Sequence, residues 1–351
     1  MDTPLADTTL YPKITNHISE IVQALTWQLR DPENPEAEVK LNPIAIVGTV
    51  KLHGTHADIL VGGDNKIILQ SRNKTNLRVT ADNYDFAKSM QSLDPTIIQL
   101  RDSFRERWKV LNPDETLDDS LPMTIAGEWI GEKIQKGVAI AKLSKRLVII
   151  SIKINGKWVA DSDYKDIEAP DHGIYNISRA GIYHSILYAE DLQRTVNELE
   201  LLADKVATQC PFAKSFGITG EGEGLVWKLV PYISDAQLWF KTKGGRFKPT
   251  FTPAPKKLSA DQEEKRAFAA TVAKLWCSEL RLEQGWDYLR EMNIPRSMQG
   301  IGPFLKWIQD DIFKEERGYI QEHEVAEGML RIEIGKVAKP WFLERAKRGD
   351  E

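Results

Sequence analysis

The stretch that decides the fold of this chain is Ile44-Ala45-Ile46-Val47-Gly48-Thr49-Val50-Lys51-Leu52-His53-Gly54. Its first seven residues are mostly apolar or β-branched, which is typical of a buried strand. The strand ends at Lys51, and His53 and Gly54 follow within three residues. A lysine alone is a weak signal, because most lysines are solvated surface charges. A lysine at a strand end is a candidate covalent nucleophile if other charged groups gather around it.

The segments around this strand predict an antiparallel sheet. Strands are expected at residues 44–50, 56–61 and 67–71, and Gly62-Gly63-Asp64-Asn65 is typical of a hairpin turn. Further strand candidates are residues 123–130, 147–154, 217–230 and 237–243. Apolar residues at helical spacing predict helices at residues 15–29, 94–110 and 189–207, with Asp94 as a cap. The first part of the chain is therefore expected to have an α+β fold.

The remainder of the chain predicts a separate helical domain. Residues 241–257 are basic, contain prolines and carry no acidic residue, which indicates a domain boundary and favours a phosphate-contacting groove over a solvated linker. Beyond them, residues 259–262 are typical of a capping box that opens a helix running to about residue 293. Helical patterns follow at 303–316 and 322–335. We therefore expect domains at residues 1–248 and 259–351.

Composition sets bounds on the class of protein. The chain has 351 residues, of which 42% are hydrophobic and 28% charged, as in an ordinary globular protein of two domains. The net charge of −4 argues against a protein that coats nucleic acid by bulk charge, although a local basic groove remains compatible. Cys210 and Cys277 lie far apart and predict no disulfide, so we expect an intracellular protein, in the cytoplasm or nucleus. We also expect a monomer. No apolar run approaches the roughly 20 residues of a membrane helix, so no membrane partner is expected.

The charged residues beside the predicted strands suggest a chemistry. Lys51, Arg72, Glu128 and Glu223 each lie on or near a strand, and Lys241 and Lys243 form a pair on another. Attack by an amine on a phosphoryl centre requires a deprotonated lysine, cations around the phosphate oxygens, and carboxylates to hold a metal ion. The inventory fits nucleotidyl transfer.

These residues resemble the motifs of covalent nucleotidyltransferases, which comprise ATP-dependent ligases and capping enzymes. Lys51-Leu52-His53-Gly54 resembles the nucleotidyl-lysine motif, and its histidine resembles the RNA ligase 2 branch, since DNA ligases typically have aspartate there. The other four matches, in the family's order, are Ser71-Arg72, Gly127-Glu128-Trp129-Ile130-Gly131, Glu223-Gly224-Leu225-Val226-Trp227-Lys228 and Phe240-Lys241-Thr242-Lys243. The resemblance covers residues 44–243 and implies an antiparallel-sheet nucleotidyltransferase (ATP-grasp-like ligase) domain.

The resemblance also implies a role for each residue. Lys51, in the motif that ends at Gly54, would attack the α-phosphorus of ATP and hold AMP. Arg72 would contact the ribose or a substrate phosphate, and Glu128 the ribose hydroxyls. Glu223 would place Mg²⁺ or Mn²⁺. Lys241 and Lys243 would neutralise the α-phosphate, and Lys228 would assist them. His53 would act in the steps that involve RNA.

The implied reaction joins RNA ends that carry a 5′-phosphate and a 3′-hydroxyl. AMP would pass from Lys51 to the 5′-phosphate, and the 3′-hydroxyl would then attack and release AMP. Two positions differ from the family pattern. Residues 147–152 are aliphatic where the family stacks an aromatic ring on adenine, and His56 stands where phage-type enzymes often have asparagine.

Other interpretations of the same residues remain open. Lys51 could be a surface lysine, Glu128 an edge-strand residue, and residues 220–224 a phosphate-cradling loop, although their alternating acidic side chains suit a metal better. Lys74 and Arg78 are rivals of Arg72. The alternatives for the whole chain are a DNA ligase, a GTP-using capping enzyme, and a non-catalytic nucleic-acid-binding protein that keeps the fold.

Overall fold

The computed structural model describes residues 11–34, 36–248 and 262–348. The chain divides into two compact units, Met1–Lys248 and Pro249–Glu351. Each unit is described by itself. The described helices are also too short or too polar to cross a membrane.

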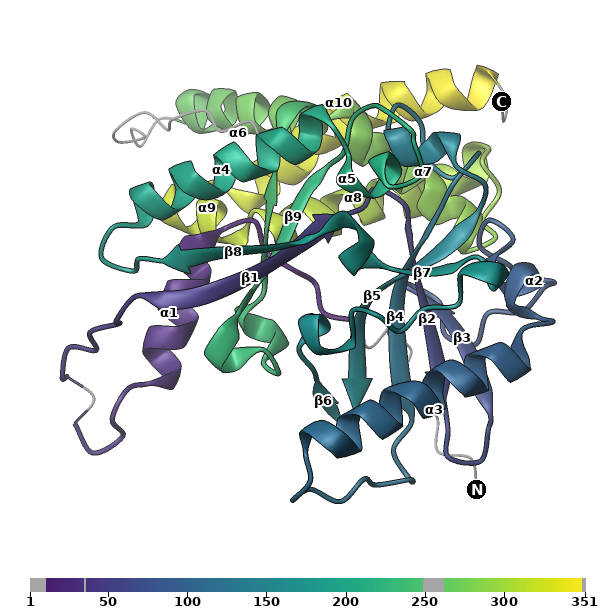
Figure 1. The fold of residues 1–351 in the computed structure, drawn as a ribbon. Coiled ribbons are helices and arrows are strands. Elements are labelled where there is room, and N and C mark those ends of the chain that lie inside the picture. The colour runs from purple at the N-terminus through teal and green to yellow at the C-terminus, as the bar shows by residue number, and fades with distance from the viewer. Residues whose placement is uncertain (1–10, 35, 249–261, 349–351) are drawn as a thin grey trace. The chain divides into compact units, whose positions relative to one another are not determined.

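The first unit contains a four-stranded antiparallel sheet (Figure 1). Its strands, in spatial order, are β10 (Phe240–Lys243), β9 (Gly224–Leu229), β1 (Ile44–Lys51) and β8 (Ile182–Leu187). Helix α4 (Leu192–Thr208) contacts β9 and β10 and covers one face of this sheet. Helix α1 (Ile18–Gln28) precedes β1, and the short helix α5 (Pro211–Lys214) follows α4.

The second sheet of this unit has six strands. Its order is β3 (Ile67–Ser71), β2 (Thr55–Val61), β4 (Met123–Ile130), β5 (Arg146–Ile154) and β6 (Lys157–Trp158), and β7 (Ile174–Asn176) pairs with β5 in parallel. Helix α3 (Asp94–Leu111) crosses its outer face in Figure 1, and α2 (Phe86–Met90) lies before it in sequence. The outer core therefore joins α2 and α3 to alternate residues of β2, β4 and β5, including Ile59, Ile125, Ile149, Phe86 and Phe104.

The inner face of the six-stranded sheet packs toward the four-stranded sheet. Ala126 of β4, Trp158 of β6 and Trp239 before β10 belong to one buried cluster, which Val226 of β9 also joins. Because side chains alternate along a strand, Glu128 lies on the same inner face as Ala126. The residues paired with Glu128 on the neighbouring strands, His56 and Val148, share that face.

Strand register in the four-stranded sheet sets the direction of the lysines. Gly224 of β9 pairs with both Lys51 of β1 and Lys243 of β10. Two residues further along β9, Val226 pairs with Lys241 of β10. Directly paired residues point to the same side of a sheet, so the three lysines share one face. The opposite face is the one that α4 covers.

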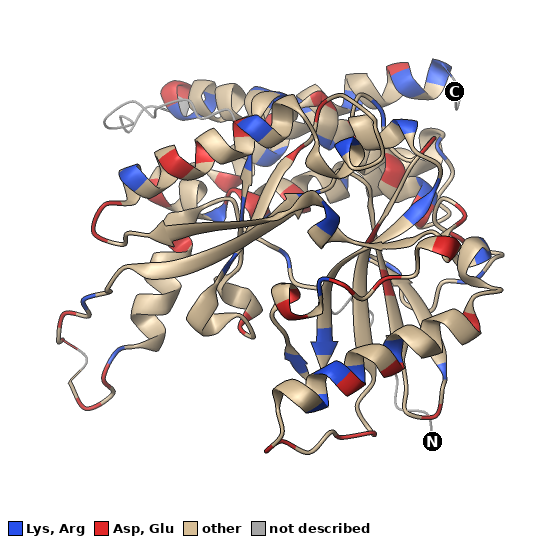
Figure 2. Cartoon of the chain, in the orientation of Figure 1, with Lys and Arg blue, Asp and Glu red and all other residues tan. Residues whose placement is uncertain are grey.

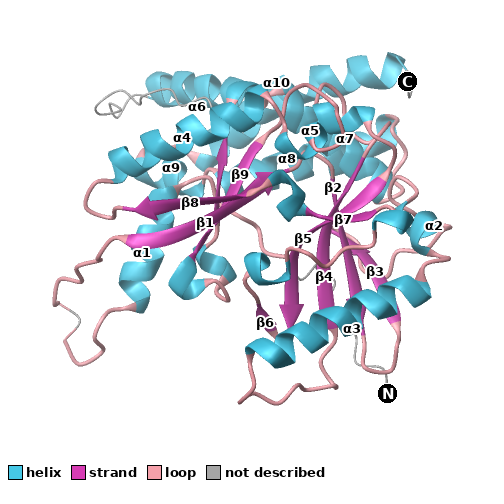
Figure 3. Cartoon of the chain, in the orientation of Figure 1, coloured by secondary structure: helices cyan, strands magenta, loops and turns pink. Residues whose placement is uncertain are grey.

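Over residues 262–348 the second unit consists of helices joined by loops and contains no strand, as Figure 3 shows. Its helices are α6 (Gln262–Trp276), α7 (Glu279–Glu291), α8 (Ile301–Glu315), α9 (Arg317–Glu322) and α10 (Glu327–Arg348). They enclose a core of their own that includes Trp286, Phe304 and Phe342. The predicted fold class, an antiparallel α+β domain followed by helices, is confirmed.

Several predicted boundaries are wrong. The helix expected to reach residue 293 is two helices, because Ser278 adopts an extended conformation and its side chain caps α7 by accepting from the Arg281 amide. Residues 259–261 of the predicted capping box, like Lys256 and Lys257 of the basic run, lie outside the described residues. Asp94 is the first helical residue of α3 and not its cap. The strand expected within 217–230 begins only at Gly224, and β8 was not predicted.

Candidate active site

The centre of the candidate site is an ion-pair cluster around Glu223. This residue directly precedes β9 and is 2% exposed. Its carboxylate lies 2.7 Å from Lys51 Nζ, 3.3 Å from Lys243 Nζ and 3.4 Å from His53 Nδ1. Figure 2 shows where charged residues interrupt the mostly uncharged strands. The strand register aligns Lys51 and Lys243 with Gly224, the residue after Glu223, and His53 reaches the cluster from the turn after β1.

The protonation state of Glu223 follows from two opposing effects. Burial raises the pKa of Glu223, because a charged carboxylate loses its hydration. The attractions of Lys51, Lys243 and His53 outweigh burial and hold the pKa well below its ordinary value. Glu223 is therefore a carboxylate at neutral pH. It neutralises part of the positive charge that would otherwise repel within the cluster.

Glu128 of β4 links that strand to the turn that follows β1. Its Oε1 accepts a 2.8 Å hydrogen bond from the Gly54 amide. Burial raises the pKa of Glu128, and the nearby Lys51 offsets part of that rise. A side chain at Gly54 would meet the Trp129 carbonyl oxygen at 2.5 Å. The glycine therefore allows the close approach of the Lys51–Gly54 turn to β4.

His53 is held by two different contacts. Its Nδ1 faces Glu223 at 3.4 Å, and its ring packs edge-on against Phe247 at 5.0 Å between centroids. Both rings are 6% exposed. Phe247 belongs to a 3-10 turn, Gly245–Phe247, directly after β10. Phe247 was expected only as part of the basic run, and its contact with His53 was not predicted.

Lys228 lies on the same sheet face as the other lysines but has its own partners. Its Nζ donates to Asp161 Oδ2 at 2.6 Å and to Ser151 Oγ at 2.7 Å, and lies 4.0 Å from the Trp239 ring centroid. Burial lowers the pKa of Lys228 and raises that of Asp161, while their mutual attraction opposes both shifts. The pair links β9 to β5 and the loop after β6. Sequence reasoning missed Asp161, which begins a short 3-10 helix, Asp161–Tyr164, and belongs to no motif.

The other two predicted cations differ in their surroundings. Lys241 is 8% exposed, and its amide donates to the Thr15 carbonyl at 2.8 Å, which attaches the segment before α1 to the edge of β10. Arg72 follows β3 and is exposed. Within the described part of the chain, Arg72 makes no ion pair or side-chain hydrogen bond.

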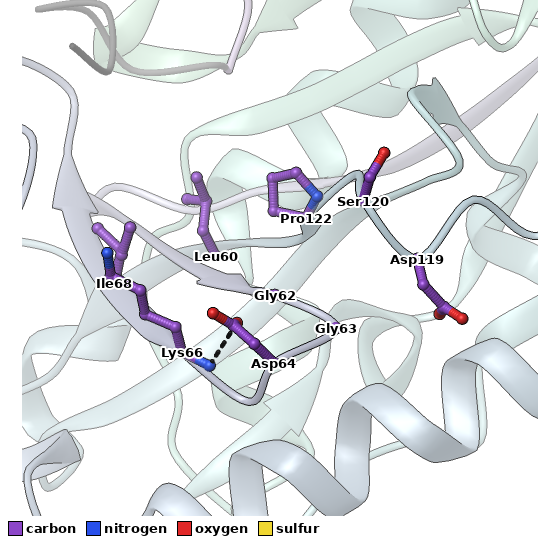
Figure 4. A pocket seen from close by; sticks show the side chains of 9 residues that line it. All are labelled: Leu60, Gly62, Gly63, Asp64, Lys66, Ile68, Asp119, Ser120 and Pro122. Carbon is purple, nitrogen blue, oxygen red and sulfur yellow. Dashed lines mark hydrogen bonds between the residues drawn. The ribbon is translucent and has the colours of Figure 1, made fainter. Parts of the chain in front are cut away.

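A cavity of about 340 Å³ lies away from this cluster, at the far end of β2 (Figure 4). It is lined by Leu60, Gly62, Gly63, Asp64, Lys66, Ile68, Asp119, Ser120 and Pro122. None of the predicted site residues borders it. Over the described residues, no group of three or more histidine, cysteine or acidic side chains is arranged to hold a metal ion by itself. Both cysteines, Cys210 and Cys277, are free and buried.

Two facing sheets, with a lysine at a strand end and glutamates and lysines around it, form the arrangement that the resemblance to covalent nucleotidyltransferases implies. A family model for RNA ligase matches residues 44–243, which is more than half of the chain, and the chain belongs to that family. The match spans every predicted site residue.

Solved structures of Naegleria gruberi RNA ligase are similar to this chain. The form with PPi is 20% identical, with 70% of this chain and 60% of that chain covered and a TM-score of 0.38. A mutant with AMP and Mn is 19% identical, with 67% and 55% covered and a TM-score of 0.37. A mutant with ATP and Mn is 21% identical, with 69% and 58% covered and a TM-score of 0.39. The chain thus spans less than two thirds of those proteins. No curated protein matches it.

Proposed function

We propose that this protein is an ATP-dependent RNA ligase that joins a 5′-phosphate end to a 3′-hydroxyl end through a lysyl-AMP intermediate. The observation that carries the proposal is the convergence of Lys51 and Lys243 on the buried carboxylate of Glu223, at 2.7 and 3.3 Å. A protein that only binds RNA has no need for two lysines held on a buried glutamate, since its phosphate contacts are made by cations without such a partner. The family match supports the choice of RNA.

In the first step, Lys51 Nζ would leave its contact with Glu223, lose a proton and attack the α-phosphorus of ATP. A P–N bond forms, the bond to the β-phosphate oxygen breaks, and pyrophosphate leaves. Lys243 and Lys241, on the same sheet face, would stabilise the negative charge that develops on the α-phosphate oxygens. His53 lies within this group and would assist the steps that involve RNA.

In the second step, an oxygen of the RNA 5′-phosphate would attack the phosphorus held by Lys51. The P–N bond breaks, and Lys51 recovers its proton. In the third step, the 3′-hydroxyl oxygen attacks the activated 5′-phosphorus, loses its proton, and AMP leaves. Arg72, exposed beside β3, would contact a substrate phosphate or the ribose.

Nucleotide recognition is assigned to the inner face of the six-stranded sheet. Glu128 would accept from the ribose hydroxyls of ATP, beside the Gly54 amide that it already binds. Val148 pairs with Glu128 and shares its face, whereas Leu147 belongs to the outer core. We therefore assign the adenine-covering role in residues 147–152 to Val148. Lys228 is assigned a supporting role, because Asp161 and Ser151 engage its amine.

A divalent metal fits the donor set only in part. Glu223 offers a buried, ionised carboxylate, and Mg²⁺ is commonly held by one or two carboxylates together with substrate phosphates and water. Glu223 would thus hold Mg²⁺ or Mn²⁺ with ATP. The bound metal would neutralise charge on the phosphates.

Incubation with α-labelled ATP and magnesium tests the proposal. Label is expected to become covalently attached to the native protein, and Lys51→Arg, which keeps the charge, is expected to abolish attachment. The native protein would then seal nicked or single-stranded RNA. Absence of attached label in the native protein would falsify the enzymatic reading. Labelling by GTP in preference to ATP would indicate a capping enzyme, and preferential sealing of DNA a DNA ligase.

A further inference from the structure

Two arginines share one pair of aromatic rings beside the six-stranded sheet. Arg146 begins β5, and Arg179 lies in a 3-10 turn, Ile177–Ala180, that follows β7. The rings are those of Tyr175 and Phe216, which lie edge to face with centroids 5.0 Å apart. The Arg146 guanidinium carbon lies 4.4 Å from the Phe216 centroid and 5.2 Å from the Tyr175 centroid. The Arg179 guanidinium carbon lies 5.2 Å from both centroids, and we call the four side chains the arginine–aromatic cluster.

The cluster carries positive charge that its surroundings do not fully neutralise. Arg179 forms an ion pair with Glu168 at 2.8 Å. Arg146 donates to the carbonyl and hydroxyl oxygens of Ser144, at 2.9 and 2.7 Å, and pairs with no carboxylate among the described residues. Burial lowers the pKa of Arg146, and repulsion from Arg179 adds to that effect. Because an arginine keeps its charge in proteins, a bound anion would stabilise this arrangement.

Both guanidinium groups remain accessible to a ligand. The Arg179 side chain is 35% exposed, and the two rings are half-buried. Arg146 is 9% exposed, and its exposed part includes Nη1, which makes no hydrogen bond within the described part of the chain. A ring that stacks on a guanidinium covers one of its faces and leaves its N–H edge free. The cluster therefore holds two sets of hydrogen-bond donors in place.

Strand register places the cluster beside the proposed nucleotide site. Tyr175 of β7 pairs with Val148 of β5, to which the adenine is assigned. Arg146 precedes Val148 by two residues, and side chains two residues apart on a strand point to the same face. Tyr175 and Arg146 therefore project from the inner face that carries Glu128.

The same end of β5 borders the turn that follows the proposed nucleophile. Ile130 of β4 pairs with Arg146. A side chain at Gly54 would meet Ile130 Cγ2 at 2.7 Å, so the turn after β1 lies against this residue. Lys51 ends β1, three residues before Gly54. The cluster and Lys51 therefore flank the same nucleotide site.

The position of the cluster distinguishes between the phosphate groups of the proposed reaction. Besides the α-phosphate, that reaction involves the departing pyrophosphate and the RNA 5′-phosphate. Arg72, assigned to a substrate phosphate or the ribose, follows β3, whereas Tyr175 lies on β7, on the other side of β4 and β5. Pyrophosphate is compact and carries several negative charges, so it suits two guanidinium groups that otherwise repel each other. The cluster therefore fits pyrophosphate better than RNA.

We propose that Arg146 and Arg179 bind the β- and γ-phosphates of ATP and hold pyrophosphate as it leaves, while Tyr175 and Phe216 orient the two guanidinium groups. This inference rests on the proposed ligase function. When the bond between the α-phosphorus and the bridging oxygen breaks, its electron pair stays on pyrophosphate, and the arginines stabilise the new charge. In the reverse reaction, a pyrophosphate oxygen attacks the phosphorus of lysyl-AMP, the P–N bond breaks, Lys51 recovers its proton and ATP forms. The steps that involve RNA make no use of the cluster.

The test compares two reactions of the full chain. In the first, protein labelled with AMP is discharged by inorganic pyrophosphate, and the pyrophosphate concentration that gives half the maximal rate of ATP release is measured. In the second, a pre-adenylated RNA donor is sealed without ATP. Arg146→Gln and Arg179→Gln are each expected to raise that pyrophosphate concentration, and the KM for ATP in labelling, by about tenfold through loss of a charge-assisted contact. Sealing of the pre-adenylated donor is expected to change little.

Two further variants make the test specific. Arg146→Lys keeps the charge but loses the planar pair of donors, so it should recover only part of the affinity for pyrophosphate. Arg194→Gln is the matched control. Arg194 of α4 makes the same kinds of contact as Arg179, an ion pair with Glu198 at 3.2 Å and a ring contact with Tyr188 at 4.0 Å. It lies outside the cluster, so its replacement should change neither reaction.

Two results would overturn the assignment. One is an unchanged response to pyrophosphate in Arg179→Gln, which remains decisive if Arg146→Gln does not fold, because Arg179 is exposed. The other is an equal loss of pyrophosphate discharge and of sealing in the variants, which would assign the cluster to RNA binding or to the fold. A native protein that takes no label from ATP is a separate outcome, which refutes the ligase function itself.

Discussion

Lys228 could either stabilise the fold through its buried ion pair with Asp161 or bind a phosphate of the nucleotide. Variants of the pair distinguish these two roles. Lys228 is 2% exposed, and in their 2.6 Å contact the Asp161 side chain is 12% exposed. Asp161→Asn would leave the ammonium of Lys228 buried without a counter-charge. Breaking a buried ion pair costs about 3–5 kcal/mol, which corresponds to a fall of about 6–20 °C in the melting temperature of a domain of this size.

A double variant is expected to recover the stability that Asp161→Asn loses. Replacing both members by apolar residues, Lys228→Met with Asp161→Leu, removes the unpaired charge and is expected to restore most of the lost stability. Melting followed by scanning calorimetry and labelling by α-labelled ATP are measured on the same preparations. We expect labelling to recover together with stability.

One outcome would refute this reasoning. If the double variant melts near the native temperature but forms no lysyl-AMP, Lys228 acts on the nucleotide and its contact with Asp161 is secondary. Asp163→Asn is the matched control, since Asp163 is an exposed carboxylate two residues away. It should change neither readout.

Three further predictions concern the cluster around Lys51. The native protein should be more stable than Glu223→Gln at pH 7, and this difference should shrink as pH falls below about 4.3. The pKa of Glu223 is lower in the folded than in the unfolded state, so the unfolded state takes up the proton first. A constant difference from pH 7 to 3 in urea unfolding experiments would contradict this prediction. Phe247→Leu should slow sealing of a pre-adenylated donor with little change in lysyl-AMP formation, because the Phe247 ring packs against His53 and not against Lys51. An equal fall in both rates would contradict a role of Phe247 in positioning His53. Gly54→Ala should lower lysyl-AMP formation by about 100-fold, because the new Cβ would meet the Trp129 carbonyl at 2.5 Å and displace the turn; normal labelling would show that the turn adapts.

The sequence was sufficient to predict the elements that position the candidate site. Lys51 and Lys243 stand at the ends of predicted strands, and once those strands pair with β9 their proximity follows from register. Glu223 was expected inside a strand at residues 217–230, whereas it directly precedes β9. Glu128 was placed on a predicted strand whose bounds, Met123–Ile130, the structure reproduces. Local pattern and family motif agreed at these positions.

The rest of the site depends on contacts that no local pattern encodes. Asp161 begins a short 3-10 helix, and Tyr11 lies in the segment before α1. Nothing in the sequence around them indicates that Asp161 contacts Lys228 or that the Tyr11 ring packs 4.7 Å from the His56 ring. The buried polar side chains of Asp58, Gln70 and Thr124 were not predicted, because they are spread over three strands. The break at Ser278 was missed because apolar residues continue on both sides of it.

The pairing of β10 determines which of its side chains face the candidate site. Because side chains alternate, a shift of β10 by one residue along β9 would turn Lys241 and Lys243 toward α4 and Phe240 and Thr242 toward the candidate site. The carbonyl of Thr15 accepts a hydrogen bond from the Lys241 amide at the other edge of β10 and so supports the observed register. The orientation of both lysines therefore depends in part on a backbone contact made by a segment more than 200 residues earlier in the chain.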